Sequence, residues 1–161
     1  MNRRKRMFVA FWATLILLAS MAAVLAIDYT DNAAAQAVIR AGAAAGVKVA
    51  AGHENDPYAY LDAFVAKKVI SKSLANKIRL YIANNKPFPT ELFVIFLADI
   101  LNGGGKTPNH ASAVKLLQAY GIKIPTGKYI TIPEISAILS DLELAQALYQ
   151  RYQSPISPTQ P

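Results

Sequence analysis

The sequence predicts an all-α protein with an N-terminal membrane-spanning helix, an alanine-rich stalk and a compact bundle of about five helices. Three observations support this prediction. Residues 7–27 contain no charged side chain. Beyond residue 56, apolar residues recur at the three- and four-residue spacing of amphipathic helices. Clusters rich in Gly, Pro and Asn separate these periodic segments, and the 161 residues suffice for one modest domain.

The N-terminal segment predicts that the protein is targeted to a membrane. Four basic residues at 3–6 precede 21 uncharged residues, and a helix of that length is about 31 Å long, close to the thickness of a bilayer's hydrocarbon core. The segment is either a signal anchor or a signal peptide cleaved after Ala26, and its length favours the anchor. Either way the basic head stays in the cytoplasm, so we expect residues from 28 onward to be periplasmic or extracellular.

Charge and cysteine content exclude several classes of protein. Four of the 17 Lys and Arg lie in the basic head. The rest of the chain has 13 Lys and Arg and 10 Asp and Glu, so its net charge is +3. This excess is too small and dispersed for a nucleic-acid-binding protein, but it suits mild attraction to anionic wall polymers or lipid headgroups. Because the chain has no cysteine, disulfides and a lipid-modified cysteine are excluded.

Residues 28–52 are dominated by alanine and contain few large apolar side chains. Asp31 or Asn32 could cap a helix here, and Gly42 and Gly46 would weaken it by about 1 kcal/mol each relative to alanine. The sequence therefore predicts a flexible spacer, with close helix association through the Gly42–Gly46 pair as the alternative.

A helical domain is predicted over residues 53–153, with halves at 57–102 and 108–153 and a disordered tail at 154–161. The helix at 90–101 is apolar on nearly all sides, which predicts that it forms the buried centre. The apolar positions of the other four helices are Leu61, Phe64 and Val65; Leu74, Ile78, Tyr81 and Ile82; Ala113, Leu116, Leu117 and Tyr120; and Ile135, Ile138, Leu139, Leu142, Ala145 and Tyr149.

Three glycines followed by Lys106 and Thr107 suggest a phosphate-binding loop, but the pattern fails. The first glycine of that motif would stand at Ile100, and a predicted helix rather than a strand precedes the loop. Gly103 instead fits the left-handed position that ends a helix, so Gly103, Gly104 and Gly105 are predicted to form a hinge between the halves and not a nucleotide site.

The second half contains a helix start of the form T-x-x-E, in which Thr131 and Glu134 are predicted to form a capping box. Aligning Glu91 with Glu134 suggests a two-fold helix–loop–helix repeat. Residues 113–144 resemble the S-layer homology module, whose second helix opens on a threonine-arginine-alanine-glutamate motif. The resemblance implies a helical fold element. Ile132 replaces the arginine that contacts anionic wall polysaccharide in that family, so the resemblance implies little about a ligand site.

Residues capable of catalysis or metal binding are sparse. His53 and His110 are the only histidines, and with Glu54 and Asp56 they do not form a metal-ligand or calcium-loop pattern. We predict no metal and no cofactor, and both histidines are expected in a loop or at a helix start. Asp99 lies on the apolar central helix, where we expect a lysine partner or a position at the rim, with a functional carboxylate of raised pKa as the alternative.

Lys123, Lys128 and Tyr129 are the candidate surface for a partner or polymer, but the favoured interpretation of the tyrosines is that several are half-buried core residues whose hydroxyls reach water. We expect a non-enzymatic, membrane-tethered interaction module, an accessory or structural subunit of an envelope complex. The alternatives are a domain that binds cell-wall polymer and, in another class, a hydrolase with a site the sequence does not show.

Overall fold

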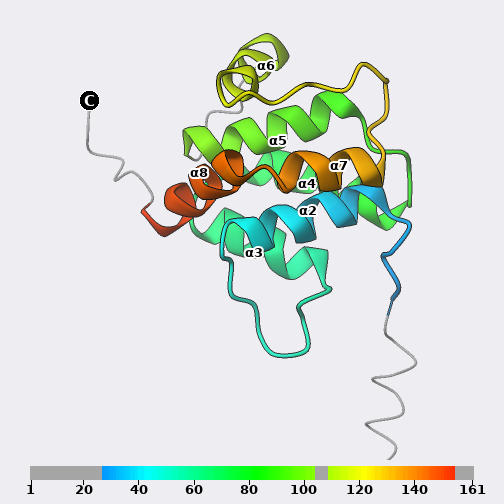
Figure 1. Cartoon of the computed structure of the whole chain (residues 1–161). Helices are drawn as coiled ribbons and strands as arrows, with labels where there is room; N and C mark the ends of the chain where they lie inside the picture. The colour runs from blue at the N-terminus through cyan, green and yellow to red at the C-terminus, as the bar shows by residue number, and fades with distance from the viewer. Residues whose placement is uncertain (1–26, 104–108, 155–161) are drawn as a thin grey trace, which may run out of the picture.

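The computed structural model describes residues 27–103 and 109–154, which form seven helices and no strand (Figure 1). The all-α prediction is confirmed. The helices are α2 (Ala33–Ala44), α3 (Pro57–Ala66), α4 (Lys72–Ala83), α5 (Thr90–Asn102), α6 (His110–Ala119), α7 (Ile132–Leu139) and α8 (Leu142–Gln153).

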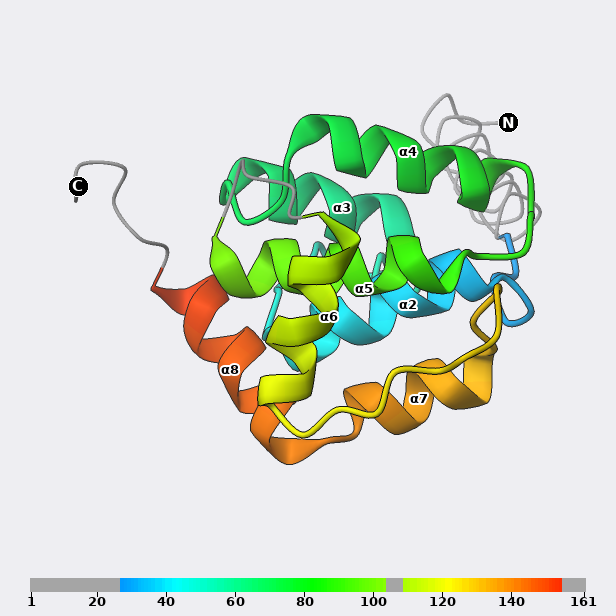
Figure 2. The same cartoon turned by 90° about the horizontal axis from the view of Figure 1, so that it is seen from above.

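Helix α5 is the centre of the bundle, as its apolar sequence predicts. Five of its large side chains are fully buried: Phe93, Val94, Phe96, Leu97 and Ile100. It contacts α2, α6 and α8, and α6 lies across its outer side (Figure 2). Aromatic rings join neighbouring helices, since the Phe64 ring of α3 makes edge-to-face contacts with Phe96 at 5.8 Å and with Tyr152 of α8 at 5.9 Å.

The predicted stalk is wrong, because its alanine-rich part is a core helix. Ala34, Ala35, Ala37, Val38 and Ala41 of α2 have no solvent exposure, and α2 contacts α3, α4, α5, α7 and α8. Alanine side chains are short, so neighbouring helices can approach the α2 backbone closely and bury it without large apolar groups.

The last predicted helix is in fact two helices. Asp141 accepts a hydrogen bond from the Leu144 amide at 2.9 Å and caps the start of α8, while the Ser140 hydroxyl donates to the Ser136 carbonyl at 2.6 Å. These local side-chain bonds compete with the helical ladder and interrupt it. Together with α2, this break raises the number of described helices from the expected five to seven.

Several predictions concern residues outside the described ranges: the membrane segment at 7–27, apart from Ile27, most of the predicted hinge and the tail from residue 155. In the part of the chain that the structure describes, no helix is both long and apolar enough to cross a membrane. The two-fold repeat stays a prediction. Along the chain, α4 precedes α5 as α6 precedes α7.

Candidate functional site

Two loops that lie forty residues apart in the sequence meet at one end of the bundle. The α4–α5 loop and the α6–α7 loop pair through one antiparallel bridge between Pro89 and Tyr129. The Ile130 amide donates to the Phe88 carbonyl at 2.9 Å, and the Thr90 amide donates to the Lys128 carbonyl at 3.0 Å. These bonds fix the backbone of both loops.

The sequence favours extended backbone on both sides of this bridge. Pro87 and Pro89 disfavour helical conformation at the residue before each of them. The Thr90 hydroxyl donates to the Gly127 carbonyl at 2.6 Å, and Thr90 is 7% exposed. This part-buried bond joins the start of α5 to the α6–α7 loop.

The side chains at the bridge divide between core and solvent. Phe88 and Ile130 are buried, whereas Tyr129 is 46% exposed and Lys128 is exposed beside it. The Lys128 ammonium lies 5.4 Å from the centroid of the Tyr129 ring, a cation–π contact. We call Lys86, Pro87, Lys128 and Tyr129, all close to the bridge and at least partly exposed, the bridged-loop surface.

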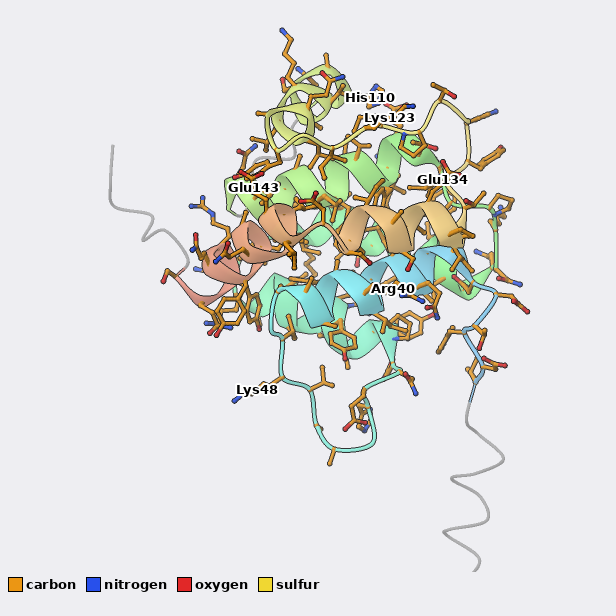
Figure 3. All side chains as sticks on the ribbon, in the orientation of Figure 1. Arg40, Lys48, His110, Lys123, Glu134 and Glu143 are labelled. Carbon is orange, nitrogen blue, oxygen red and sulfur yellow. The ribbon has the colours of Figure 1, made fainter. Side chains whose placement is uncertain are left out.

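Lys123, the third residue predicted for this surface, lies earlier in the α6–α7 loop. It is exposed between the buried Ile122 and the half-buried Ile124. Figure 3 shows Lys123 and His110 on the α6 side of the bundle, away from Arg40 and Lys48. Among the described residues no hydrogen bond or ion pair joins Lys123 to Lys128 or Tyr129. Of the three predicted residues, Lys128 and Tyr129, which are neighbours in the chain, are the pair in direct contact among the described residues.

The charge around the bridged-loop surface is mainly positive. The sequence has no acid between Asp99 and Glu134, although Glu91 is exposed in the first turn of α5. Glu134 is held by the helix start that follows the bridge: Thr131 donates to its carboxylate from the amide at 3.2 Å and from the hydroxyl at 2.7 Å. The predicted capping box is confirmed, and both its residues have a structural role.

The sequence indicated Lys128 and Tyr129 but missed Lys86 and Pro87. Nothing local in the α4–α5 loop points to the other loop, because only the bridge brings the two together. The repeated arrangement of a proline-containing loop before a Thr-containing helix start was the one available signal.

The predicted hinge has one described member. Gly103 ends α5 with φ of 71°, as expected for a helix C-terminus, and the Arg151 guanidinium packs against it while donating to the Asn102 carbonyl. A Cβ at Gly103 would lie 2.8 Å from Arg151 Cζ. Gly104 and Gly105 lie outside the described residues.

Asp99 differs from its prediction. The side chain is fully buried, and its Oδ2 accepts a hydrogen bond from the Ser71 amide at 3.0 Å, which ties the α3–α4 turn to α5. Burial raises the pKa of the Asp99 carboxyl, and the hydrogen bond from Ser71 lowers it in part. The expectation of a lysine partner or a rim position is wrong, and the carboxylate has a structural role here.

The histidines lie where the sequence places them. His53 is in the turn before α3, with Nδ1 at 3.4 Å from the Asp56 carboxylate that caps this helix, and His110 is exposed at the first position of α6. Within residues 27–103 and 109–154, no three His, Cys, Asp or Glu side chains group as metal ligands would.

A cavity of about 490 Å³ with a mixed polar and apolar lining opens where the described residues begin. Its lining includes Asp28, Asp31, Asn32, Tyr29 and Tyr58. Hydrogen bonds from the Thr30 hydroxyl and amide lower the pKa of Asp28, which keeps that carboxyl ionised. The two tyrosine rings meet edge to face at 6.4 Å.

The tyrosines divide between the two predicted roles. Tyr60 and Tyr152 are buried, Tyr29, Tyr58, Tyr81 and Tyr120 are half-buried, and Tyr129 and Tyr149 are exposed. Tyr149 packs against Gly46. Tyr129 therefore remains the tyrosine best placed to contact a ligand.

Comparisons with known proteins give no family. No family model, no curated protein and no solved structure matches this chain. Function must therefore be inferred from the residues themselves.

Proposed function

We propose that the protein is a non-enzymatic, membrane-tethered interaction module that acts outside the cytoplasm, as an accessory or structural subunit of an envelope complex. The observation that carries this proposal is the bridged-loop surface. An exposed tyrosine and an exposed lysine are held against each other on backbone that three hydrogen bonds to the facing loop restrain. A surface already fixed in one conformation loses little entropy when a partner binds.

The first candidate for the partner is a protein. Tyrosine is enriched at protein interfaces because one side chain offers a large apolar area and a hydroxyl. Tyr129 exposes an apolar ring and a hydroxyl beside the Lys128 ammonium. The buried side chains of Phe88 and Ile130 hold the two bridged loops against the core. The tether, predicted from residues 7–27, would hold this surface near other envelope proteins.

A wall polymer is the second candidate, favoured by charge. The α6–α7 loop has Lys123 and Lys128 and no acid, and an exposed tyrosine ring can stack on a sugar. The resemblance of residues 113–144 to the S-layer homology module points to the same class of ligand. Ile132, which replaces the arginine of that motif, argues for a weaker polymer contact.

Crosslinking in intact membranes tests the proposal. We expect the full chain to crosslink reproducibly to one envelope protein and the double variant K128A/Y129A to lose that crosslink. The matched control K48A/L142A removes an exposed lysine and an exposed apolar side chain elsewhere, and it should crosslink like the unmodified chain. Both variants should keep the helical far-UV spectrum, because the altered side chains point to solvent.

Co-sedimentation of the detergent-solubilised chain with purified sacculi separates the two candidates. Saturable, salt-sensitive binding that K128A/Y129A abolishes would replace the protein partner with a wall polymer. A chain that neither crosslinks nor sediments, or a variant that behaves like the control, overturns the role of the bridged-loop surface.

A further inference from the structure

The bundle begins almost immediately after the predicted membrane segment. Asn32 is 7% exposed, its Nδ2 donates to the Ile82 carbonyl at 2.9 Å, and its Oδ1 caps α2 by accepting from the Ala35 amide at 2.9 Å. The Tyr29 carbonyl accepts from the Asn32 amide at 3.0 Å and from Gln36 Nε2 at 3.1 Å.

Tyr29 is thus already held by the fold, and only Asp28 separates it from residue 27. Two fully extended residues cover about 7 Å, which is about the thickness of one lipid headgroup layer. With no stalk, the bundle cannot stand away from a membrane in which residues 7–27 are inserted.

The first described residues lie beside the C-terminal end of α4. Ile27 lines one cavity together with Ile82, Ala83 and Asn85, and Figure 2 shows residues 27–32 and the end of α4 at the same end of the bundle. On the neighbouring surface of α4, Leu80, Tyr81, Asn84 and Lys86 line an open groove of about 220 Å³. Both hollows lie at the C-terminal end of α4, and we call Ile27 and Tyr29 of the first together with Leu80, Tyr81 and Lys86 of the second the N-terminal face.

This face has the composition of a membrane interface. Ile27 is 69% exposed and Leu80 is 63% exposed, both large apolar side chains in contact with water. Tyrosine and lysine combine an apolar body with a polar tip, and both are favoured where hydrocarbon meets headgroups.

The charges around the N-terminal face do not indicate a binding site for a charged ligand. Asp28 and Asp31 line the same cavity as Ile27 and Tyr29 and offset the charge of Lys86, while the Arg79 guanidinium is paired with Asp62. A wall polyanion or another strongly charged ligand would find little attraction here, whereas a lipid surface would bury the apolar side chains.

We infer that the N-terminal face rests in the headgroup layer of the membrane that holds residues 7–27, and so fixes the orientation of the bundle on that membrane. This inference rests on the tether in the proposed function. Because burial of apolar and tyrosine side chains drives the contact, it should persist at high salt and without anionic lipid.

Three single-cysteine variants of the full chain in nanodiscs test it, since the chain has no cysteine of its own. An environment-sensitive fluorophore is attached at L17C in the predicted span, at L80C on the N-terminal face, or at L142C. Leu142 is 85% exposed at the start of α8, and Figure 2 shows α4 and α7 on opposite sides of α5, so L142C is the matched exposed control.

At L80C we expect strong quenching by lipids brominated near the headgroup, and severalfold weaker quenching by aqueous iodide than at L142C. Raising the salt concentration should leave both results unchanged. At L17C, quenching by lipids brominated deep in the chain reports the tether itself.

The outcomes separate the inference from the function on which it rests. If L17C is quenched by lipid and L80C is as exposed to iodide as L142C, the N-terminal face does not touch the membrane and the inference falls alone. If L17C is not quenched by lipid, the tether fails. If L80C is shielded from iodide but not quenched by lipid, protein covers this face, which also overturns the inference.

Discussion

Gly42 of α2 gives the sharpest test of the central position of this helix. A Cβ at residue 42 would lie 2.8 Å from Tyr60 Cγ and closer still to Cδ1, well inside any normal contact. Tyr60 cannot move away easily, because it is 5% exposed and its hydroxyl donates to the Glu54 carbonyl at 3.0 Å. Gly42→Ala should therefore force α2 and α3 apart.

Two opposing effects set the magnitude. Replacing glycine by alanine inside a helix stabilises it by about 1 kcal/mol, whereas overpacking a core costs about 1–3 kcal/mol and more in severe cases. With a clash this short the upper part of that range applies, so the net loss is about 1–2 kcal/mol. For a domain of this size the Tm should fall by about 4–8 °C.

Thermal and urea unfolding followed by circular dichroism measure the effect. Ala43→Gly, at the exposed neighbouring position, is the matched control for helix propensity and should cost at most about 1 kcal/mol. If steric overlap is the cause, the double variant G42A/Y60V should show strong favourable coupling between the two sites. Stabilisation of the protein by G42A would refute the steric reasoning.

Three further predictions follow from the site and its supports. Thr131→Ala removes the side-chain acceptor of the capping box and should lower the free energy of unfolding by about 1 kcal/mol, measured by urea denaturation. Thr90→Val removes the bond to the other loop at a cost of about 1 kcal/mol, and hydrogen exchange at the Ile130 amide should speed up; unchanged exchange would show that the bridge does not need Thr90. Because burial raises the folded-state pKa of Asp99 above 3.8, the folded state binds the proton more tightly, and stability from this group falls as pH rises from 3.8 through the raised pKa. Asp99→Asn should flatten that part of the stability–pH curve, and an unchanged curve would contradict the assignment.

The features that the sequence predicted correctly depend on neighbours in the chain. The capping box at Thr131 and Glu134, the helix end at Gly103 and the cap at Asn32 are all made within a few residues, so their patterns can be read directly. The buried centre at 90–101 was also predictable, because it offers no polar face.

The features that the sequence missed depend on partners far along the chain. Alanine has little hydrophobic contrast, so the pattern of α2 could not show that Tyr60 would pack on Gly42 and that five helices would cover the segment. The break at Ser140 had a local signal in Asp141, but the continuous apolar spacing across it favoured one helix. Only the tertiary structure brings the α4–α5 loop to Tyr129 and thereby forms the bridged-loop surface, since hydrogen bonds across forty residues leave no periodic trace in the sequence.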